Sequence, residues 1–478
     1  MPEIKENIKL TAHQQIAFDK LVEFVNAPHR RVFILRGYAG TGKTTMMRQF
    51  IKYLNDADIS YELVASTGRA AKILYNATGE QTSTIHGMIY TFNDINEDIE
   101  TFVKEREKVN VDSNGQLFLM FSLNTVLCNN SQKCYIVDEA SMVSDKVDKL
   151  ATQAVFGSGR LLSDLLAFDR DSKFIFVGDS CQLPPVNQKV SPALSAAYFK
   201  EMHDIDADDV ELTEVMRQTE GNDIVLSAKK MRQLYHAPQP WKWAKFPMKG
   251  YNNIKIVPSQ ARLIEMYVQD VKKNGFDEAT LICFSNSQSR TLTNIIRPQF
   301  GKIANTLQTG DLLLVTQNNL VSGLLNGDLV VVDCIGGRVM RAGLTFVTVS
   351  VTELTSKRRY KQYMIEEILY QNAINITQEQ QTDIYIDFYK RMKARGIKQR
   401  SRMFNEEMRT DPFLNALRAV YGYALTCHKS QGGEWNRVYL DISRNLPSIE
   451  KPYVYQWMYT AMTRARKELY IVDDFWIM

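Results

Sequence analysis

The sequence predicts an α/β fold, because short apolar runs alternate with helix-like segments along most of the chain. Runs that are apolar throughout, with β-branched or aromatic residues and polar flanks, are typical of strands buried on both faces of a parallel sheet. Such runs lie at Val32 to Leu35, Tyr61 to Ser66, Cys134 to Val137, Lys173 to Val177 and Thr280 to Phe284. Helix-like stretches such as Arg69 to Tyr75 separate them, and this alternation builds layered α/β domains.

The first of these strands leads into a glycine-rich stretch that predicts a phosphate-binding loop. A helix is expected to begin near Lys43, directly after the glycines. Glycine lets the backbone turn so that its amides face one point, where they hold phosphates. The Lys43 ammonium would lie at the β and γ phosphates, and the Thr44 hydroxyl would bind the Mg²⁺ that accompanies a nucleotide. The expected nucleotide contacts are Gly37, Ala39, Gly40, Thr41, Gly42, Lys43, Thr44 and Thr45.

Composition is that of a multidomain globular protein. The 478 residues suffice for about two to four domains. The net charge of +4 permits a nucleic-acid partner without requiring one. Six scattered cysteines form no metal-ligand or disulfide pattern, and no signal peptide or membrane span is recognisable, so we expect a cytoplasmic protein.

Local sequence signals predict further elements along the chain. Thr11 is the expected N-cap of a first helix. Asn114-Gly115, between two strand-like runs, predicts a projecting hairpin. Alternating β-branched residues from Gly310 to Leu354 predict a small antiparallel β-domain. The chain from Tyr360 to Arg409 has a charged, helical character, and its basic run from Lys390 to Arg402 is either a solvated helix face or a phosphate-contacting surface.

Two strand ends carry the residue types that nucleotide hydrolysis needs. Asp138 is expected to hold Mg²⁺, partly through water, and Glu139 to orient the attacking water as a base. One strand later, Gln182 follows Val177 and could hydrogen-bond the γ-phosphate or the attacking water. Together with Lys43, the residues Glu139 and Gln182 are therefore the candidate catalytic groups.

With these motifs in order, the chain resembles the superfamily-one helicases from about residue 10 to 472. GYAGTGKT, IVDEAS and GDSCQLPP are similar to motifs I, II and III of that superfamily. The stretch LTAHQ resembles the adenine-reading glutamine motif, through Gln14 or alternatively Gln15. ASTGRAA and STIH resemble motifs Ia and Ib, LTEVMRQ motif IV, TCHKSQGGE motif V and YTAMTRAR motif VI.

The nearest form of this resemblance is the RecD-like group, whose members move 5′ to 3′ on DNA. It implies two RecA-like parallel-sheet domains with ATP between them, a β-hairpin insertion in the first and an SH3-like β insertion in the second. The expected domains are 1–205, with the hairpin at about 90–130; 206–305 together with 415–478; and an inserted β-domain with a charged helical segment at 306–414. The motifs begin almost at the N-terminus, so we expect no long N-terminal extension.

The resemblance also assigns roles residue by residue. Arg217 and Arg464 are the expected arginines that reach the γ-phosphate and complete the catalytic set of Lys43, Glu139 and Gln182. Gly433 and Glu434 join Gln14 and Asp138 among the ATP-binding residues. The expected DNA contacts are Thr67, Arg69, Thr84, His86, Phe118, His428 and Ser430. The residues that could stack on bases are Phe118, Phe121, Tyr235, His236, Trp241 and Trp243.

The function predicted from sequence is an ATP-dependent DNA helicase with Mg²⁺ as its cation. Expected partners are single-stranded DNA and junctions of single and double strands, together with replication or repair proteins; we expect a monomer. Two alternatives within the enzyme class stay open, an RNA helicase and a translocase that does not unwind, because recognition of the 2′-hydroxyl has no linear motif. From another class comes a nucleotide-gated DNA-binding subunit of a larger machine, which would need a damaged ATP site.

The predicted hairpin generates a first test. It lies between motifs Ib and II, where a duplex would be split, so deletion of residues 111–118 should abolish strand separation and leave DNA-stimulated ATPase in place. The two activities would be measured on the same preparation with a forked substrate and a single-stranded oligonucleotide. Equal loss of both would show that this segment does not act in strand separation.

Overall fold

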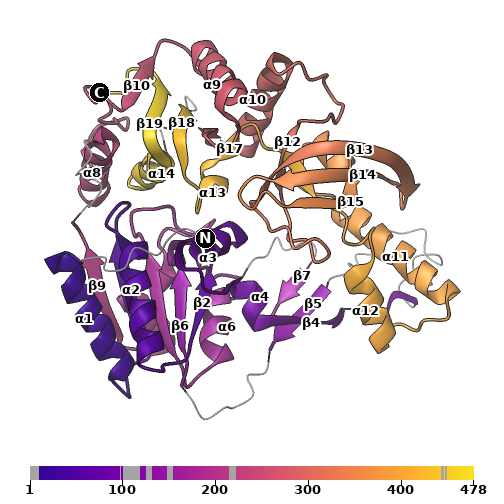
Figure 1. The fold of residues 1–478 in the computed structure, drawn as a ribbon, viewed down its shortest axis with the longest axis horizontal. Helices are drawn as coiled ribbons and strands as arrows, with labels where there is room; N and C mark the ends of the chain where they lie inside the picture. The colour runs from indigo at the N-terminus through magenta and orange to yellow at the C-terminus, as the bar shows by residue number, and fades with distance from the viewer. Residues whose placement is uncertain are drawn as a thin grey trace.

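The structure is a computed structural model that describes residues 10–96, 98–100, 119–124, 132–147, 154–214, 222–442, 446 and 449–478. It contains two parallel sheets, an antiparallel sheet beside them and a small three-stranded sheet (Figure 1). The small sheet is inserted in the chain of the first parallel sheet, and the antiparallel sheet in the chain of the second. The expected α/β class, with a β insertion in each half, is confirmed.

The first parallel sheet has the strand order β3-β2-β6-β8-β1-β9, with every pairing parallel. Alternate residues of β1 serve two cores: Phe33 and Leu35 pack under α1 and α2, and Val32 and Ile34 pack on the opposite face. The strands are β1 (Val32–Gly37), β2 (Tyr61–Ala65), β3 (Thr82–Thr84), β6 (Cys134–Asp138), β8 (Lys173–Gly178) and β9 (Ala207–Leu212). The helices are α1 (Ala12–Asn26), α2 (Lys43–Asp56) and α3 (Gly68–Thr78) on one face, and α4 (Ile85–Ile89), α6 (Leu161–Phe168) and α7 (Ala196–His203) on the other.

Strand β9 corrects the expected end of the first domain at residue 205. It pairs in parallel with β1 from Ala207 to Leu212 and forms the edge of the first sheet. Its sequence, ADDVEL, lacks the continuous apolar run of a central strand, because an edge strand has one neighbour and is more exposed to solvent. A search for fully apolar runs therefore passes over it.

The second parallel sheet has the order β10-β19-β18-β11-β17 and lies above the first in the view of Figure 1. Its core includes fully buried Trp457, Tyr455 and Tyr439, which pack among the strands and helices of this half. The strands are β10 (Ile254–Val257), β11 (Ala279–Cys283), β17 (Leu425–Thr426), β18 (Trp435–Asp441) and β19 (Ala465–Val472). The helices are α8 (Asp223–His236), α9 (Gln260–Asn274), α10 (Asn286–Gln299), α13 (Cys427–Ser430) and α14 (Tyr453–Met462).

The expected antiparallel β-domain is a five-stranded sheet with the order β15-β14-β13-β12-β16. Its tight hairpin turn, between β13 and β14, is Ala342-Gly343, both at positive φ. The strands are β12 (Leu312–Val315), β13 (Leu329–Arg341), β14 (Leu344–Glu353), β15 (Arg359–Ile365) and β16 (Ala419–Tyr421). Strand β16 therefore extends this sheet beyond the expected limit at residue 414.

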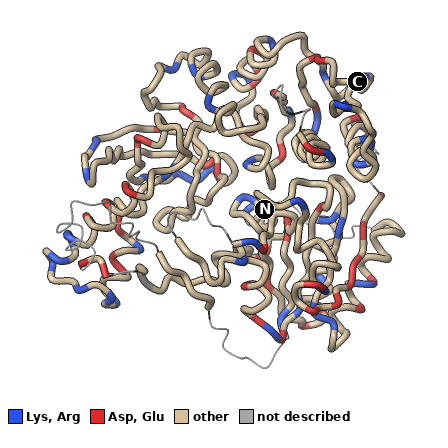
Figure 2. Tube along the Cα trace, turned by 180° about the vertical axis from the view of Figure 1, so that it is seen from behind, with Lys and Arg blue, Asp and Glu red and all other residues tan. Residues whose placement is uncertain are grey.

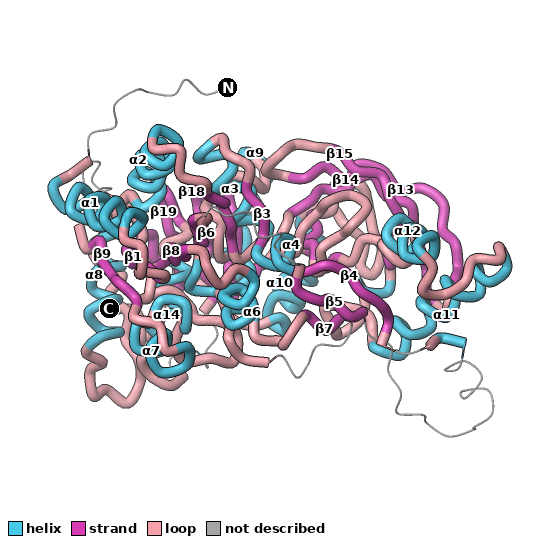
Figure 3. The backbone as a smooth tube through the Cα atoms, turned by 90° about the horizontal axis from the view of Figure 1, so that it is seen from below, coloured by secondary structure: helices cyan, strands magenta, loops and turns pink. Residues whose placement is uncertain are grey.

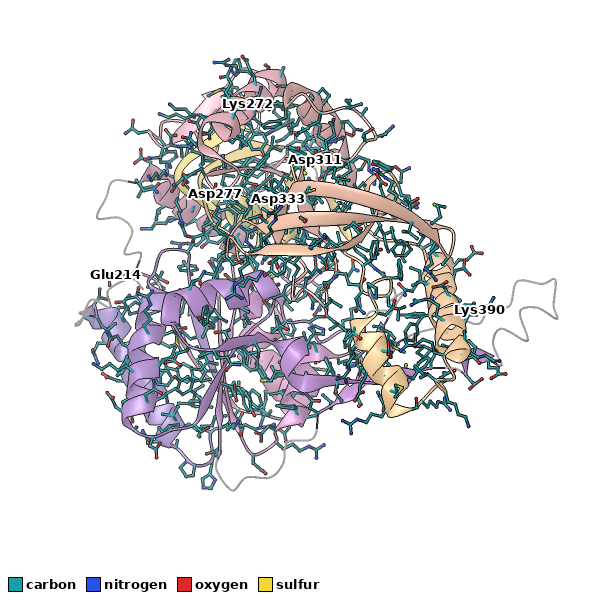
Figure 4. All side chains as sticks on the ribbon, turned by 45° about the vertical axis from the view of Figure 1, so that its right-hand side comes forward. Glu214, Lys272, Asp277, Asp311, Asp333 and Lys390 are labelled. Carbon is teal, nitrogen blue, oxygen red and sulfur yellow. The ribbon has the colours of Figure 1, made fainter. Side chains whose placement is uncertain are left out.

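Between β15 and β16 lie helices α11 (Gln378–Ala394) and α12 (Arg402–Thr410), so the segment from Tyr360 is helical only after a strand. The basic run that includes Lys390, marked on α11 in Figure 4, is partly neutralised. Arg391 pairs with Asp387 and Asp411, and Arg395 pairs with Glu407. These ion pairs favour a structural role for much of the run.

Along the described part of the trace, cationic and acidic residues are interspersed (Figure 2).

The small sheet joins β4 (Tyr90–Ile95) to β5 (Leu119–Leu123) in antiparallel register, and β7 (Ala154–Phe156) pairs in parallel with β5. The antiparallel pair confirms a hairpin-like insertion in this half. Asn114-Gly115 lies outside the described residues. Phe121 stacks on Phe156 with ring centroids 4.6 Å apart, so this predicted base-stacking residue belongs to the core of the small sheet.

Strand β4 runs toward α11 and α12, the two helices between β15 and β16 (Figure 3). Ile95 and Ile99 are buried in one core with Tyr385, Phe388 and other apolar residues of α11 and α12. Tyr389 donates a hydrogen bond to Glu100 at 2.8 Å, across 289 residues of sequence. The hairpin arm and the second insertion thus share one hydrophobic core.

Within the described part of the chain, no helix has both the length and the apolar character needed to cross a membrane.

The shared core predicts a loss of stability on truncation. Ile99 is fully buried, so Ile99→Ala should lower the free energy of unfolding by about 2 to 5 kcal/mol, from lost burial and the cavity left behind. Thermal or urea unfolding would measure the change. Ile16→Ala on α1 is the control, since Ile16 is 54% exposed and its truncation should cost far less.

Candidate active site

The predicted phosphate loop lies between β1 and α2, as expected, with α2 beginning at Lys43. Gly40 and Gly42 have φ of 82° and 78°, the left-handed region that glycine adopts without strain. The Lys43 ammonium donates to the carbonyls of Gly37 at 2.5 Å and Tyr38 at 3.2 Å. The side chain of Thr44 is exposed at the start of α2. The loop therefore has the conformation and the cation that phosphate binding needs.

Gln14, the expected adenine reader, has both ends of its amide engaged within the protein. Its Nε2 donates to the carbonyl of Thr41 at 3.0 Å, and its Oε1 accepts from the backbone N–H of Thr11. Thr11 in turn caps α1, as predicted. Gln15 donates to Asp19 on the exposed face of the helix. In this structure Gln14 therefore supports the phosphate loop itself.

The two candidate carboxylates lie at the C-terminal end of β6, Asp138 as its last residue and Glu139 directly after it, at the same end of the first sheet as the phosphate loop. Burial raises the pKa of Asp138, and the charge of Lys43 acts to lower it. Burial, followed by the charge of Asp138, raises the pKa of Glu139, and Arg464 and Lys43 act in the opposite direction. Glu139 also has φ 50°, an unfavourable conformation for a residue with a side chain, which is often found at functional sites.

The segment Asp179 to Leu183 follows β8 and forms the next wall of the site. The Gln182 side chain is 4% exposed, and its Oε1 has no hydrogen-bond partner among the described residues. Asp179 is close enough to Glu139 to raise the pKa of that carboxyl. An unpaired amide oxygen in a buried position is available to a ligand or water, consistent with the role expected for Gln182.

The second sheet contributes groups to the same site. Arg464 is 4% exposed and is held by the carbonyls of Thr460, at 3.0 Å from Nε, and Gly433, at 3.4 Å from Nη1. Its charge acts on Glu139 of the first sheet. The structure thus brings Lys43, Asp138, Glu139, Asp179 and Arg464 together, although Arg464 lies more than 400 residues from Lys43 in sequence.

The structure places an arginine against the phosphate loop, Arg232, that the sequence did not predict. Arg232 of α8 is 7% exposed, and its guanidinium lies 3.7 Å from the centre of the Tyr38 ring. Both residues border the place where the loop meets α8 and α14. Nothing in the pattern of α8 distinguishes Arg232 from a surface arginine, so only the spatial arrangement could reveal this contact.

Of the predicted DNA contacts in the first half, two threonines act as helix caps. Thr67 Oγ1 accepts from the N–H of Ala70, and Thr84 Oγ1 accepts from the N–H of Gly87. A capping oxygen still has a hydroxyl proton to donate, so this role does not prevent a contact to phosphate. His86 packs edge-on against Phe156 with ring centroids 5.2 Å apart, and burial lowers its pKa.

The remaining predicted contacts gather where three parts of the chain meet. The Arg69 guanidinium lies 4.3 Å from the centre of the Trp435 ring, and Gly433 approaches Arg69 so closely that a Cβ would lie 2.5 Å from Arg69 Cζ. Glu434, an expected ATP contact, pairs with Arg466 at 2.9 Å. It also borders a cavity of about 180 Å³ together with Arg69.

A loop of the antiparallel sheet reaches the same place. Leu325 covers the start of α3, where a Cβ on Gly68 would lie 2.2 Å from Leu325 Cβ. Lys72 of α3 pairs with Asp328 at 2.5 Å. Burial lowers the pKa of His428. Ser430 donates to the carbonyl of Cys427 at 2.8 Å. The segment after α13 lies against the start of α3, since a Cβ on Gly432 would lie 3.4 Å from Ala70 Cβ.

Two site predictions, Arg217 and Phe118, lie outside the described residues. Among the aromatic candidates, Trp241 and Trp243 are 37% and 40% exposed, His236 is exposed, and Tyr235 packs against the core of the second half.

The residues at the loop suit the Mg²⁺ that accompanies a nucleotide. Thr44 and Asp138 offer hydroxyl and carboxylate oxygens, the hard donors that this cation prefers. A divalent charge would also offset the burial that raises the pKa of Asp138. The donor set therefore fits the predicted cation.

Comparison with known proteins agrees with this arrangement. A family model described as an AAA domain matches residues 9–236, and one described as a UvrD-like helicase C-terminal domain matches residues 421–472. An uncharacterised protein of Acanthamoeba polyphaga mimivirus is 23% identical over 95% of this chain and 98% of its own length. The ATP-dependent RecD2 DNA helicase of Deinococcus radiodurans is 24% identical over 96% of this chain.

The chain spans about half of that RecD2 helicase, 48% of its length. Among solved structures, Pif1 helicase from Bacteroides in complex with ADP-AlF3 and ssDNA has a TM-score of 0.49 at 16% identity, covering 98% of this chain and 93% of its own. Pif1 helicase from Candida albicans has a TM-score of 0.42 at 15% identity, covering 98% and 96%.

A phosphate loop in one parallel sheet, completed by an arginine from a second, defines a P-loop protein with a composite nucleotide site. The two family models and the RecD2 relative agree with this class: the chain is similar to superfamily-one helicases of the RecD-like type.

The position of Glu139 generates a test of its role. Glu139→Gln keeps the size of the side chain and removes its basicity, so ATP turnover should fall about a hundredfold or more, with binding of ATP intact. Steady-state ATPase and fluorescent-nucleotide titration would measure the two effects. Glu62→Gln on β2, whose side chain is 46% exposed, is the control and should keep normal turnover. Normal turnover in Glu139→Gln would assign the base elsewhere.

Proposed function

We propose that the protein is an ATP-dependent DNA helicase that moves 5′ to 3′ on single-stranded DNA and unwinds duplex. The observation that carries this proposal is the composite site, in which Arg464 of the second sheet acts on Glu139 beside the phosphate loop of the first. A site shared by two sheets is sensitive to their separation. Hydrolysis there can be converted into relative movement of the two halves.

Within this proposal each residue has a chemical task. The loop from Gly37 to Thr45 holds the phosphates, and Lys43 exchanges its carbonyl partners for phosphate oxygens. Glu139 accepts the proton of the attacking water, and the Gln182 amide orients that water. Arg464, with Arg217 as a second candidate, neutralises charge that develops on the γ-phosphate.

The proposed DNA contacts follow the junction described above. Thr67, Arg69, Thr84 and His86 would hold the strand from the first half, and His428 and Ser430 from the second. If the two sets hold the strand alternately as the halves close and open, each ATP moves the protein along it. In this structure Leu325 and the Lys72–Asp328 pair cover part of that junction, so a bound strand would displace the loop or pass beside it.

The direction of movement rests on the resemblance to the RecD-like group, because helicases of either polarity use the same ATP-site groups. An RNA helicase and a translocase that does not unwind share these groups as well. A nucleotide-gated binding subunit without hydrolysis is disfavoured by the intact set of Lys43, Asp138, Glu139 and Arg464.

The decisive experiment compares two fluorescent duplexes that differ only in carrying a 5′ or a 3′ single-stranded tail, each incubated with Mg-ATP. Opening of the 5′-tailed duplex alone is expected. Lys43→Ala is the control and should open neither, because the loop loses its phosphate-binding cation. A matched set of RNA tails tests the choice of nucleic acid.

Opening of the 3′-tailed duplex alone would contradict the proposed polarity and keep the motor. Opening of neither, with ATPase stimulated by single strands, would favour a translocase. Absence of ATPase under every condition would contradict the enzyme reading altogether.

A further inference from the structure

One side chain of the second half makes hydrogen bonds to two motifs of the first. The Tyr459 hydroxyl of α14 accepts a hydrogen bond from the backbone N–H of Ala39 in the phosphate loop at 3.0 Å. The same hydroxyl donates to Asp179 Oδ2 at 2.7 Å. The other oxygen of Asp179 accepts from the N–H of Cys181 at 2.9 Å. A continuous chain of hydrogen bonds thus runs from the phosphate loop through Tyr459 to the segment that carries Gln182.

These groups are buried, so each hydrogen bond matters to its neighbours. Tyr459 and Asp179 are each 1% exposed. Burial, followed by the charge of Asp179, raises the pKa of Tyr459 far above its usual value, so the hydroxyl stays protonated and remains a donor. Without it, Asp179 Oδ2 would lack a hydrogen-bond donor among the described residues, and an unpaired buried carboxylate oxygen is costly.

Other residues of α14 hold the backbone of the same segment. Thr460 Oγ1 accepts from the N–H of Leu183 at 2.9 Å. Gln456 Nε2 donates to the carbonyls of Ser180 at 3.3 Å and Gln182 at 3.4 Å. These bonds fix the segment to the second half. Tyr459 differs from them because it also reaches the phosphate loop.

We propose that Tyr459 is a positioning residue that couples the nucleotide to the grip on DNA by tying the phosphate loop, through Asp179, to the second half of the protein. This inference rests on the proposed function, because it concerns the same ATP site. When phosphates accept hydrogen bonds from the amides of the loop, the hydrogen bond from the Ala39 N–H to the Tyr459 hydroxyl is altered. That change passes to Asp179, to the segment with Gln182 and to α14, whose last turn holds Arg464 through the carbonyl of Thr460. Tyr459 need not touch the phosphates for this role.

The test measures coupling and not activity alone. The affinity for a fluorescent single-stranded DNA oligonucleotide is determined by anisotropy without nucleotide and with a saturating non-hydrolysable ATP analogue. The ratio of the two affinities is the coupling factor, which is typically about 5- to 150-fold in linked sites. In Tyr459→Phe, which keeps the ring and removes the hydroxyl, we expect this ratio to shrink at least about threefold toward unity.

A matched control separates coupling from a general loss of stability. Tyr423 is also fully buried, and its hydroxyl donates to buried Asp311 at 2.8 Å. Asp311 lies where the antiparallel sheet meets the second half, away from the phosphate loop (Figure 4). Tyr423→Phe therefore loses the same kind of hydrogen bond elsewhere, and it should keep the wild-type coupling factor.

Asp179→Asn provides a second route if Tyr459→Phe folds poorly, and the double variant tests whether the two residues act as one unit. We expect the double variant to lose no more coupling than either single one, because both changes break the same hydrogen bond. Fully additive losses would overturn the proposed path through Asp179.

The outcomes distinguish this inference from the proposed function. Coupling in the wild type that persists unchanged in Tyr459→Phe overturns the role of Tyr459 and leaves the helicase proposal standing. Equal loss in Tyr459→Phe and Tyr423→Phe also overturns it, by showing an effect of stability. Absence of any DNA binding by the wild type, with or without nucleotide, contradicts the proposed function itself and the inference with it.

Discussion

The interface between α14 and the segment Asp179 to Leu183 is the contact on which the rest of the site depends. A phosphate loop can be built by one sheet, because glycine and the start of α2 supply what it needs. The γ-phosphate role proposed for Arg464 requires in addition that a second folded unit is held at a fixed distance from the loop. Here side-chain hydrogen bonds from α14 to backbone groups achieve this, while Arg464 on the next turn of chain faces Glu139.

Sequence reasoning succeeded where chemistry is local. Strands β1, β2, β6 and β8 of the first parallel sheet, β11 of the second, the start of α2 at Lys43 and the cap at Thr11 follow from periodicity, glycine placement and hydrogen-bond geometry within a few residues. It failed at elements defined by their neighbours. Edge strand β9 has no apolar signature, and the tight turn at Ala342-Gly343 does not show the Asn-Gly pattern, because β13 and β14 impose the positive φ.

The same division holds for the site. Lys43, Asp138, Glu139 and Arg464 were recognisable because their motifs are contiguous in sequence, and the structure brings them together. Arg232 on Tyr38 and the two hydrogen bonds of Tyr459 join residues hundreds of positions apart, so no local pattern records them. For Gln14 and Glu434 the structure adds contacts that the motifs do not record: Gln14 donates to the carbonyl of Thr41, and Glu434 pairs with Arg466.

The core shared by the hairpin arm and α11 and α12 has a consequence for biosynthesis. Ile95 and Ile99 leave the ribosome long before their partners, since Glu100 and Tyr389 are 289 residues apart. At common rates of translation, the arm waits on the order of 15 to 60 s for α11 to appear. During that interval its apolar residues are exposed on a nascent first half that is otherwise able to fold. Production of this protein should therefore depend on protection of that short segment, by a chaperone or by a low growth temperature, more than on the stability of either parallel sheet.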